Sequence, residues 1–409
     1  MNITIQPTLL KGNITPPPSK SQAHRMVIAA ALAGGVSQLS GLARSQDITA
    51  TLNCMAAMGA GVELTRENAA RIHGLGYSGP QKDNGLLRFD CGESGSTLRF
   101  LIPVALAVVG GGCFTGRGRF MERPQQPYFN LFDEKGIFYK QEDGVLTVKG
   151  VLKPGRYELP GNVSSQFITG LLYALPVLQG DSEIVLTTPL ESEGYVDMTL
   201  EALEQFGIRV RREGTGFVVP GDQQYKSGDV CIEADWSQAA FWYAARALGS
   251  DVTVAGLNKG SAQGDRVIAE QFEQLTAPGD VTLDVSQCPD LVPALAAMAA
   301  VRQGRTCITN AARLRIKESD RLAAVTQVLC KMGADVTEQP EGLTIVGREG
   351  LAGGVAVDSC NDHRIAMMAA VAATRCQKPV TVVDAHCVAK SYPDFWEDYE
   401  KLGGRINRS

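Results

Sequence analysis

One pattern recurs along the chain and limits what it can fold into. A short polar or glycine-containing opening leads into an apolar helix with almost no charge, and copies begin near Ser19, Gly92, Gly161, Ala234, Cys288 and Cys360. Most copies end at a glycine, which tolerates the left-handed conformation that caps a helix. The spacing is roughly 70 residues with one shorter copy of about 50, which indicates an internal repeat.

The segments after each apolar helix repeat as well. A short β-branched strand comes next, and then a helix with one charged face, as in DITATLNCMAAMGAGVEL, YVDMTLEALEQFGIRVRR and RLAAVTQVLCKMGADVTE. A helix that is apolar on all sides has to be surrounded by protein. Six such units predict an α/β fold of two similar domains, each with three repeats around buried helices.

The length also favours two domains, because 409 residues exceed one ordinary hydrophobic core. The polar, turn-rich stretch QQYKSGD at 223–229 is a candidate boundary. The first residues, ITIQPTLL, read as a strand that could return to the C-terminal half. We therefore expect one domain at 13–226 and a second, discontinuous domain at 1–12 plus 227–409.

Composition excludes several classes of function. A net charge of −5 argues against nucleic acid as the main partner. No Cys/His cluster suggests a metal site, and no glycine-rich nucleotide motif is found. The start has no signal-peptide pattern and no apolar run reaches about 18 residues, so we expect a cytoplasmic protein without a membrane span. The ten cysteines stand singly, and we expect reduced, buried thiols.

The helix openings carry hydroxyls and cations. Lys20, Ser21 and Arg25 stand at the first opening, Arg99 follows the second, and Arg364 follows the sixth. Each opening alone could be a helix cap with a solvated arginine. Cations at a helix N-terminus oppose the helix dipole, however, so their recurrence indicates an anionic ligand that also satisfies the unpaired N–H groups.

Further charged groups lie outside these openings. Lys317 and Arg321 share a helix face with Glu318 beside them, which alone could be a surface ion-pair cluster. Arg123 and Lys390 lie in proline-containing loops, MERPQ and AKSYPDF. Arginine suits bidentate binding of carboxylate or phosphate, and lysine suits point-charge work. A separate carboxylate, Asp290 in CPDLV, is either a cap or a general base.

These stretches together resemble a known family. PSKSQAHR, GESGSTLR, MERP, SSQF, ESEGYVD, the PD at 289–290, KESDR, NDHR and AKSYPDF follow one another as in the 5-enolpyruvylshikimate-3-phosphate synthases, or 3-phosphoshikimate 1-carboxyvinyltransferases. The resemblance runs nearly end to end. It implies two domains of three β-α-β-α-β-β repeats around buried parallel helices, an inside-out α/β barrel, with the active site in the cleft between them.

The resemblance also implies a reaction. Enolpyruvyl would pass from phosphoenolpyruvate to the 5-hydroxyl of shikimate 3-phosphate through a tetrahedral intermediate, releasing phosphate in the shikimate pathway to chorismate and the aromatic amino acids. No metal or organic cofactor would take part, and we expect a monomer. Because two anions must be brought together, clustered cations are needed to offset their repulsion.

The resemblance carries over site residues one by one. The residues expected to bind shikimate 3-phosphate are Lys20, Ser21, Arg25, Ser164, Ser165, Gln166, Ser192, Tyr195, Asp290, Arg313 and Lys317. Those expected to bind phosphoenolpyruvate are Lys20, Gly95, Arg123, Gln166, Arg321, Arg364 and Lys390. The catalytic set would be Asp290 as base toward the 5-hydroxyl, Glu318 as proton donor to the methylene carbon, and Lys20 near the leaving phosphate.

Three positions depart from the family pattern. Glu93 stands where many relatives have Asn, Phe100 where others often have Pro, and Arg313 where an Asn contacting shikimate 3-phosphate is expected. Arg313 could contact the phosphate differently or face solvent.

Two alternatives stay open. One is the related enolpyruvyl transfer to a UDP-amino sugar, although Cys113 does not lie in the loop where that enzyme's cysteine is expected. The other is a non-catalytic, anion-binding relative.

Overall fold

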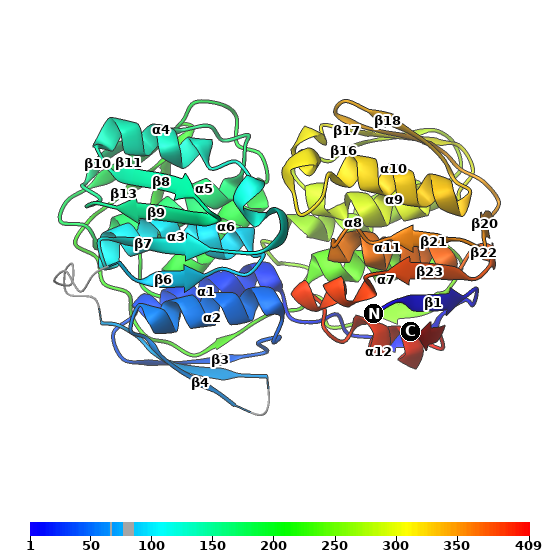
Figure 1. Ribbon diagram of the computed structural model, residues 1–409, viewed down its shortest axis with the longest axis horizontal. Coiled ribbons are helices and arrows are strands. Elements are labelled where there is room, and N and C mark those ends of the chain that lie inside the picture. Colours follow the sequence, from blue (N-terminus) through cyan, green and yellow to red (C-terminus); the bar gives the residue numbers. More distant parts are fainter. Residues whose placement is uncertain (66–67, 77–85) are drawn as a thin grey trace. The chain divides into compact units, whose positions relative to one another are not determined.

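The chain folds as two compact units, each with its own hydrophobic core (Figure 1). The computed structural model describes residues 1–65, 68–76 and 86–409. One unit, named the 18–233 unit, comprises residues 18–233. The other, named the 234–409 unit, comprises residues 1–17 together with 234–409.

Strand pairing sets where the units divide. From the sequence we expect divisions at 12/13 and 226/227, whereas the units divide at 17/18 and 233/234. Strand β2 (Lys11–Ile14) runs parallel to β15 (Asp251–Val254), which keeps residues 13 and 14 with the 234–409 unit. Strand β14 (Val230–Cys231) runs parallel to β3 (Val36–Ser40), which keeps the residues after 226 with the 18–233 unit.

The described residues of the 18–233 unit form three four-stranded sheets with one pairing pattern. Their orders are β14-β3-β5-β4, β6-β7-β9-β8 and β10-β11-β13-β12, and in each the first pair is parallel while the other two are antiparallel. The remaining strands are β4 (Gly61–Leu64), β5 (Ala70–His73), β6 (Arg88–Asp90), β7 (Gly111–Thr115), β8 (Phe138–Glu142), β9 (Val145–Lys149), β10 (Gly155–Leu159), β11 (Ser182–Leu186), β12 (Arg211–Glu213) and β13 (Gly216–Val219).

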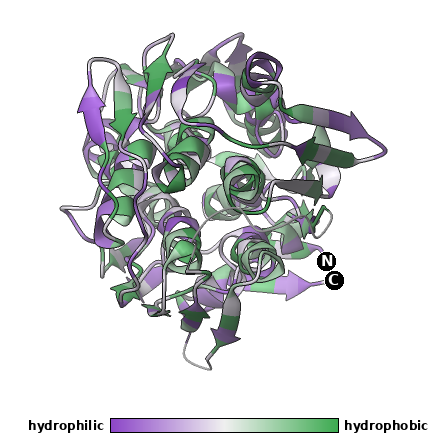
Figure 2. Cartoon of the chain, turned by 90° about the vertical axis from the view of Figure 1, so that its left-hand side faces the viewer, coloured by the Kyte–Doolittle hydropathy of each residue, from purple (hydrophilic) through white to green (hydrophobic). Residues whose placement is uncertain are grey.

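Each repeat of this unit adds one inner and one outer helix. The inner helices are α1 (Lys20–Leu32), α3 (Gly95–Val108) and α5 (Ser165–Ala174), and the outer helices are α2 (Gln46–Ala57), α4 (Gln126–Lys135) and α6 (Glu193–Gln205). Figure 2 shows apolar residues gathered on helices seen nearly end-on inside the molecule. The inner helices are buried along most of their length, which confirms the prediction made from their lack of charge.

The 234–409 unit repeats the pattern. Its four-stranded sheets are β16-β17-β19-β18 and β21-β23-β1-β24, and two further sheets are the parallel pairs β15-β2 and β20-β22. The strands are β16 (Val281–Asp284), β17 (Arg305–Thr309), β18 (Asp335–Gln339), β19 (Gly342–Val346), β20 (Leu351–Gly353), β21 (Ala356–Asp358), β22 (Cys376–Lys378), β23 (Val380–Val383) and β24 (Arg405–Arg408). The helices are α7 (Trp236–Ala247), α8 (Ile268–Thr276), α9 (Val292–Ala300), α10 (Arg321–Met332), α11 (His363–Ala373) and α12 (Phe395–Lys401).

The N-terminal strand completes this unit. Strand β1 (Ile3–Gln6) lies antiparallel between β23 and β24, where Ile3 faces Val382 on one side and Arg408 on the other. Ile3 and Ile5 are fully buried in its core. Among the described residues, none of the helices has the length and apolar character needed to cross a bilayer.

Candidate active site

The opening of α1 holds a lysine–aspartate pair. Ser19 caps the helix by accepting the N–H of Gln22 at 3.3 Å. Lys20 Nζ lies 2.9 Å from Asp47 Oδ2 on α2, and both side chains are mostly buried. The sequence alone gives Asp47 no role, because a carboxylate in the first turn of an amphipathic helix is an ordinary stabilising feature. The tertiary structure makes it the partner that orients Lys20.

Arg25, one turn further along α1, is fixed from three sides. Its guanidinium donates to the backbone oxygens of Ser21 (2.6 Å) and Tyr195 (2.7 Å) and to Thr199 Oγ1 (2.9 Å). Burial lowers the pKa of Arg25 to about 10, which leaves it charged at neutral pH. Three residues expected at one substrate, Ser21, Arg25 and Tyr195, are thus brought together by α1 and the start of α6. Ser192, which precedes α6, is buried in a left-handed conformation.

A second group joins the openings of α3 and α5. Gln166 accepts from Arg99 Nη1 and donates to Ser96 Oγ, both at 2.9 Å. Arg99 also donates to the Pro124 carbonyl at 3.0 Å, which ties in the loop that carries Arg123. In the sequence, Arg99 is visible only as a cation at a helix opening. The structure makes it the residue that positions Gln166.

Gly95 and Arg123 are in contact. A methyl group built on Gly95 would lie only 2.6 Å from Arg123 Nη1, so the guanidinium occupies the space that a side chain would need. Ser164 caps α5 by accepting the N–H of Gln166 at 3.3 Å, with Ser165 buried behind it. All ten site residues predicted between 20 and 195 therefore lie at or beside helix openings of the 18–233 unit.

In the 234–409 unit, Asp290 contacts three cations. Its carboxylate lies 2.8 Å from Arg321 Nη1, 3.0 Å from Arg364 Nη2 and 3.4 Å from Lys317 Nζ. Asp290 belongs to a 3-10 turn, η4 (Pro289–Leu291), directly before α9. Burial lowers the pKa of the Lys317 ammonium, with Asp290 acting in the opposite direction. Three of the predicted phosphate- and carboxylate-binding cations thus meet at the predicted base.

Arg321 has carboxylates on several sides. It also lies 2.7 Å from Glu318 and 2.7 Å from Asp362, and its side chain is 1% exposed. Burial opposes its charge, but Asp362, Glu318 and Asp290 more than compensate and raise its pKa. Asp362 is fully buried and caps α11 by accepting the N–H of Arg364 at 3.0 Å. The sequence showed Asp362 in NDHR, but only the structure reveals it as the anchor of Arg321.

The last two predicted residues have backbone partners. Lys390, in the 3-10 segment η6 (Ala385–Lys390), is buried and donates to the Asn361 carbonyl at 2.6 Å. Arg313 donates to the Ser286 carbonyl. The positive charge of Arg313 also contributes to the lowered pKa of Lys317, after burial and the nearer charges. Arg313 thus acts electrostatically on the Asp290 cluster, and its contact with substrate stays a prediction.

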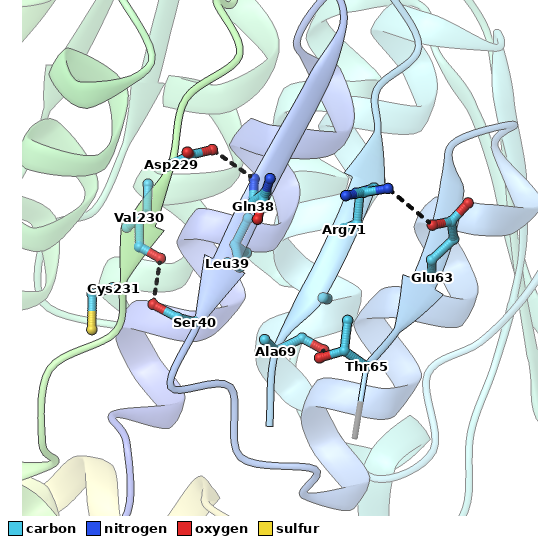
Figure 3. Close-up of a pocket in the computed structure, with 11 residues that line it drawn as sticks. Gln38, Leu39, Ser40, Glu63, Thr65, Ala69, Arg71, Asp229, Val230 and Cys231 are labelled. Atoms are coloured by element: carbon cyan, nitrogen blue, oxygen red, sulfur yellow. Dashed lines mark hydrogen bonds and ion pairs between the residues drawn. The ribbon is translucent and has the colours of Figure 1, made fainter. Parts of the chain in front are cut away.

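A hollow of about 510 Å³ lies apart from these groups, on the sheet that contains β3, β4, β5 and β14 (Figure 3). Its polar side chains pair locally: Arg71 lies 4.0 Å from Glu63, and Asp229 accepts the N–H of Gln38 at 3.3 Å. It contains none of the predicted substrate residues. Within 1–65, 68–76 and 86–409, no group of three or more His, Cys, Asp or Glu side chains is arranged to hold a metal ion.

This architecture is that of the enolpyruvyl transferases. It consists of two units of repeated sheets around buried helices, and cations gather at the helix openings. An enolpyruvyl transferase from Streptomyces tendae has this fold, with a TM-score of 0.78 at 18% identity over 99% of this chain and 98% of its own. The EPSP synthase of Acinetobacter baumannii matches with a TM-score of 0.81 at 27% identity, covering all of both chains.

Sequence comparison identifies the family. The model of EPSP synthase (3-phosphoshikimate 1-carboxyvinyltransferase) matches residues 5–399. A 3-phosphoshikimate 1-carboxyvinyltransferase of Clostridium kluyveri is 46% identical over 99% of this chain and 98% of its own length. That of Clostridium beijerinckii is 44% identical over 98% of each. The chain belongs to the EPSP synthase family.

Proposed function

We propose that this chain transfers the enolpyruvyl group of phosphoenolpyruvate to the 5-hydroxyl of shikimate 3-phosphate and releases phosphate. The proposal rests on the surroundings of Asp290. Its carboxylate lies within 3.4 Å of three cations, and one of these, Arg321, also forms an ion pair with Glu318. The reaction needs cations for two anionic substrates, a base for an alcohol and an acid for a methylene carbon. Membership of the family supports the choice of both substrates.

The contacts suggest how binding prepares the base. Arg321 and Arg364 each donate a side-chain N–H to Asp290. The anionic groups of phosphoenolpyruvate are strong bidentate acceptors for guanidinium. When they take over these N–H groups, Asp290 is left to accept the proton of the 5-hydroxyl. Glu318 delivers the proton to the methylene carbon and takes one back on elimination.

The predicted residues at the helix openings of the 18–233 unit are assigned to the same substrates. Lys20 stands near the leaving phosphate and, with Gln166, contacts both substrates. Ser21, Arg25, Ser164, Ser165, Ser192 and Tyr195 hold shikimate 3-phosphate with Lys317 and Arg313, while Gly95, Arg123 and Lys390 hold phosphoenolpyruvate. The proposal places the reaction in the cytoplasm, in a monomer that uses no metal or organic cofactor.

A phosphate-release assay tests the function. The purified chain with phosphoenolpyruvate is expected to release phosphate in proportion to added shikimate 3-phosphate, and to release none with a UDP-amino sugar. Cys113 fits this choice, because it lies in β7 with its Sγ 3.7 Å from Thr147 Oγ1 rather than in a loop. Release with the sugar nucleotide would establish the first alternative, and no release with either acceptor would favour a non-catalytic relative.

Gly95→Ala gives a sharper prediction. The new methyl group would push against Arg123 Nη1, so we expect the KM for phosphoenolpyruvate to rise by about tenfold or more while the fold is kept. Steady-state kinetics in both substrates measures this change. Gly228→Ala is the matched control, because nothing lies within 4 Å of its added Cβ. An unchanged KM in Gly95→Ala would separate Arg123 from the donor site.

A further inference from the structure

A buried row of hydrogen-bonded side chains links three helices of the 18–233 unit. His24 Nδ1 on α1 lies 2.7 Å from Thr51 Oγ1 on α2, and Thr51 Oγ1 lies 2.7 Å from Thr97 Oγ1 on α3. Thr97 then donates its hydroxyl to Ser94 Oγ, the cap of α3, at 2.8 Å. All four residues are at most 1% exposed. None of them is among the residues that the proposed function assigns to substrate binding or catalysis.

The direction of these bonds follows from counting protons. A threonine hydroxyl has one proton, and Thr97 gives its own to Ser94. Thr51 must therefore donate to Thr97, and its 3.4 Å contact to the Asp47 carbonyl is secondary. Thr51 then has only lone pairs left for His24, so the Nδ1 of His24 carries the ring proton.

The surroundings of His24 support this direction. Burial, and after it the charges of Lys20 and Arg25, lowers the pKa of His24 well below its usual range, so the ring is neutral and holds one proton. With that proton on Nδ1, the Nε2 atom carries only a lone pair, and it has no hydrogen-bond partner among the described residues. The reverse direction would leave a buried N–H without an acceptor, and buried orphan donors are the rarer case.

At the other end, Ser94 retains a proton. Its oxygen accepts the backbone N–H of Thr97 at 3.2 Å and the Thr97 hydroxyl at 2.8 Å. No hydrogen bond donated by Ser94 Oγ occurs within residues 1–65, 68–76 and 86–409. Ser94 immediately precedes Gly95, which contacts Arg123. The spare hydroxyl proton is thus at the helix opening where the proposed function puts an anion.

We propose that the row His24–Thr51–Thr97–Ser94 is a positioning device for phosphoenolpyruvate: it holds the opening of α3 against α1 and α2 and orients the Ser94 hydroxyl to donate to an anionic oxygen of the donor substrate. The inference rests on the proposed function. His24, Thr51 and Thr97 are positioning residues that act through Ser94, and Ser94 is the member that contacts substrate. Lys20 and Arg25 lie on the same helix as His24, so the row also joins the two substrate clusters of this unit.

Threonine-to-valine substitutions test the row, because they remove a hydroxyl and nearly preserve shape. Thr51→Val and Thr97→Val are each expected to raise the KM for phosphoenolpyruvate by about fivefold to tenfold, because the hydrogen bond that Ser94 donates is weakened rather than removed. The KM for shikimate 3-phosphate should stay within about twofold. Thr51→Ser and Thr97→Ser, which retain the hydroxyl, should restore the wild-type KM. The double valine variant should be no worse than the poorer single variant, because either change breaks the same row.

Thr169→Val is the matched control. Thr169 Oγ1 lies 2.9 Å from Thr199 Oγ1 in another fully buried threonine pair of the same core, so its loss costs comparable stability. It should leave the KM for phosphoenolpyruvate unchanged. Valine variants that melt earlier but keep both wild-type KM values, or that raise both KM values equally, would overturn the proposal. Wild-type turnover in the same assay reports on the function separately, so the failure of one is distinguishable from that of the other.

Discussion

Asp290→Asn is expected to lower kcat by about a thousandfold, the largest kinetic effect predicted for this chain. The amide keeps the volume of the carboxylate but cannot accept a proton from the 5-hydroxyl. Lys317, Arg321 and Arg364 remain, and losing the competing carboxylate leaves them available to anions. The two substrates should therefore bind at least as well as to the wild type.

Two measurements separate chemistry from binding in this variant. Single-turnover phosphate release gives the rate of the chemical step, and isothermal titration with each substrate gives its Kd. Asp335→Asn is the control, because Asp335 forms only an exposed 3.5 Å ion pair with Arg348 in the same unit. A kcat within tenfold of the wild-type value would remove Asp290 from the role of base.

Asp362→Ala is expected to destabilise the 234–409 unit by about 3 kcal/mol or more. Its carboxylate is fully buried and 2.7 Å from a guanidinium that is 1% exposed. Truncation removes the carboxylate that pairs with Arg321. It also removes the acceptor of the Ser319 hydroxyl, which lies at 3.0 Å, and the N-terminal cap of α11. Asp290 and Glu318 still hold Arg321, so the loss should lie near the lower end for buried ion pairs.

Tryptophan fluorescence in urea measures this loss selectively. The three tryptophans, Trp236, Trp242 and Trp396, all belong to the 234–409 unit, so their signal follows that unit alone. Asp320→Ala is the matched control. Asp320 caps α10 and pairs with Arg315, but both side chains are about one-third exposed, so only about 1 kcal/mol should be lost. An equal loss of unfolding free energy in the two variants would contradict the idea that burial makes the Asp362 ion pair more important than the partly exposed Asp320 pair.

The repeat architecture could be predicted from the sequence because its signals are local. A helix that is apolar around its body, with its few charges at the opening, has to be surrounded by protein. The helices α1, α3 and α5 are buried along most of their length. Cations next to a helix opening are equally visible, and this located Lys20, Arg25 and Arg364. The family resemblance added Ser192 and Tyr195, which no local pattern singles out. It also supplied the roles of Arg123 and Lys390, which the sequence alone shows only as cations in proline-containing loops.

The tertiary structure decided which charges meet. Asp47 and Lys20 are 27 positions apart, and Arg321 and Asp362 are 41 apart. No helical or strand period relates residues at such separations, so neither partnership is visible in the chain. The same holds for His24, Thr51 and Thr97, which look like ordinary helix residues until three helices pack together.

The sequence by itself thus determined the elements, their burial and the chemical class of the ligands, because these depend on the character of neighbouring residues. Only the folded chain decided the partner of each charge and the direction of the buried hydroxyl row. Those depend on distances of about 3 Å between helices, and packing sets such distances.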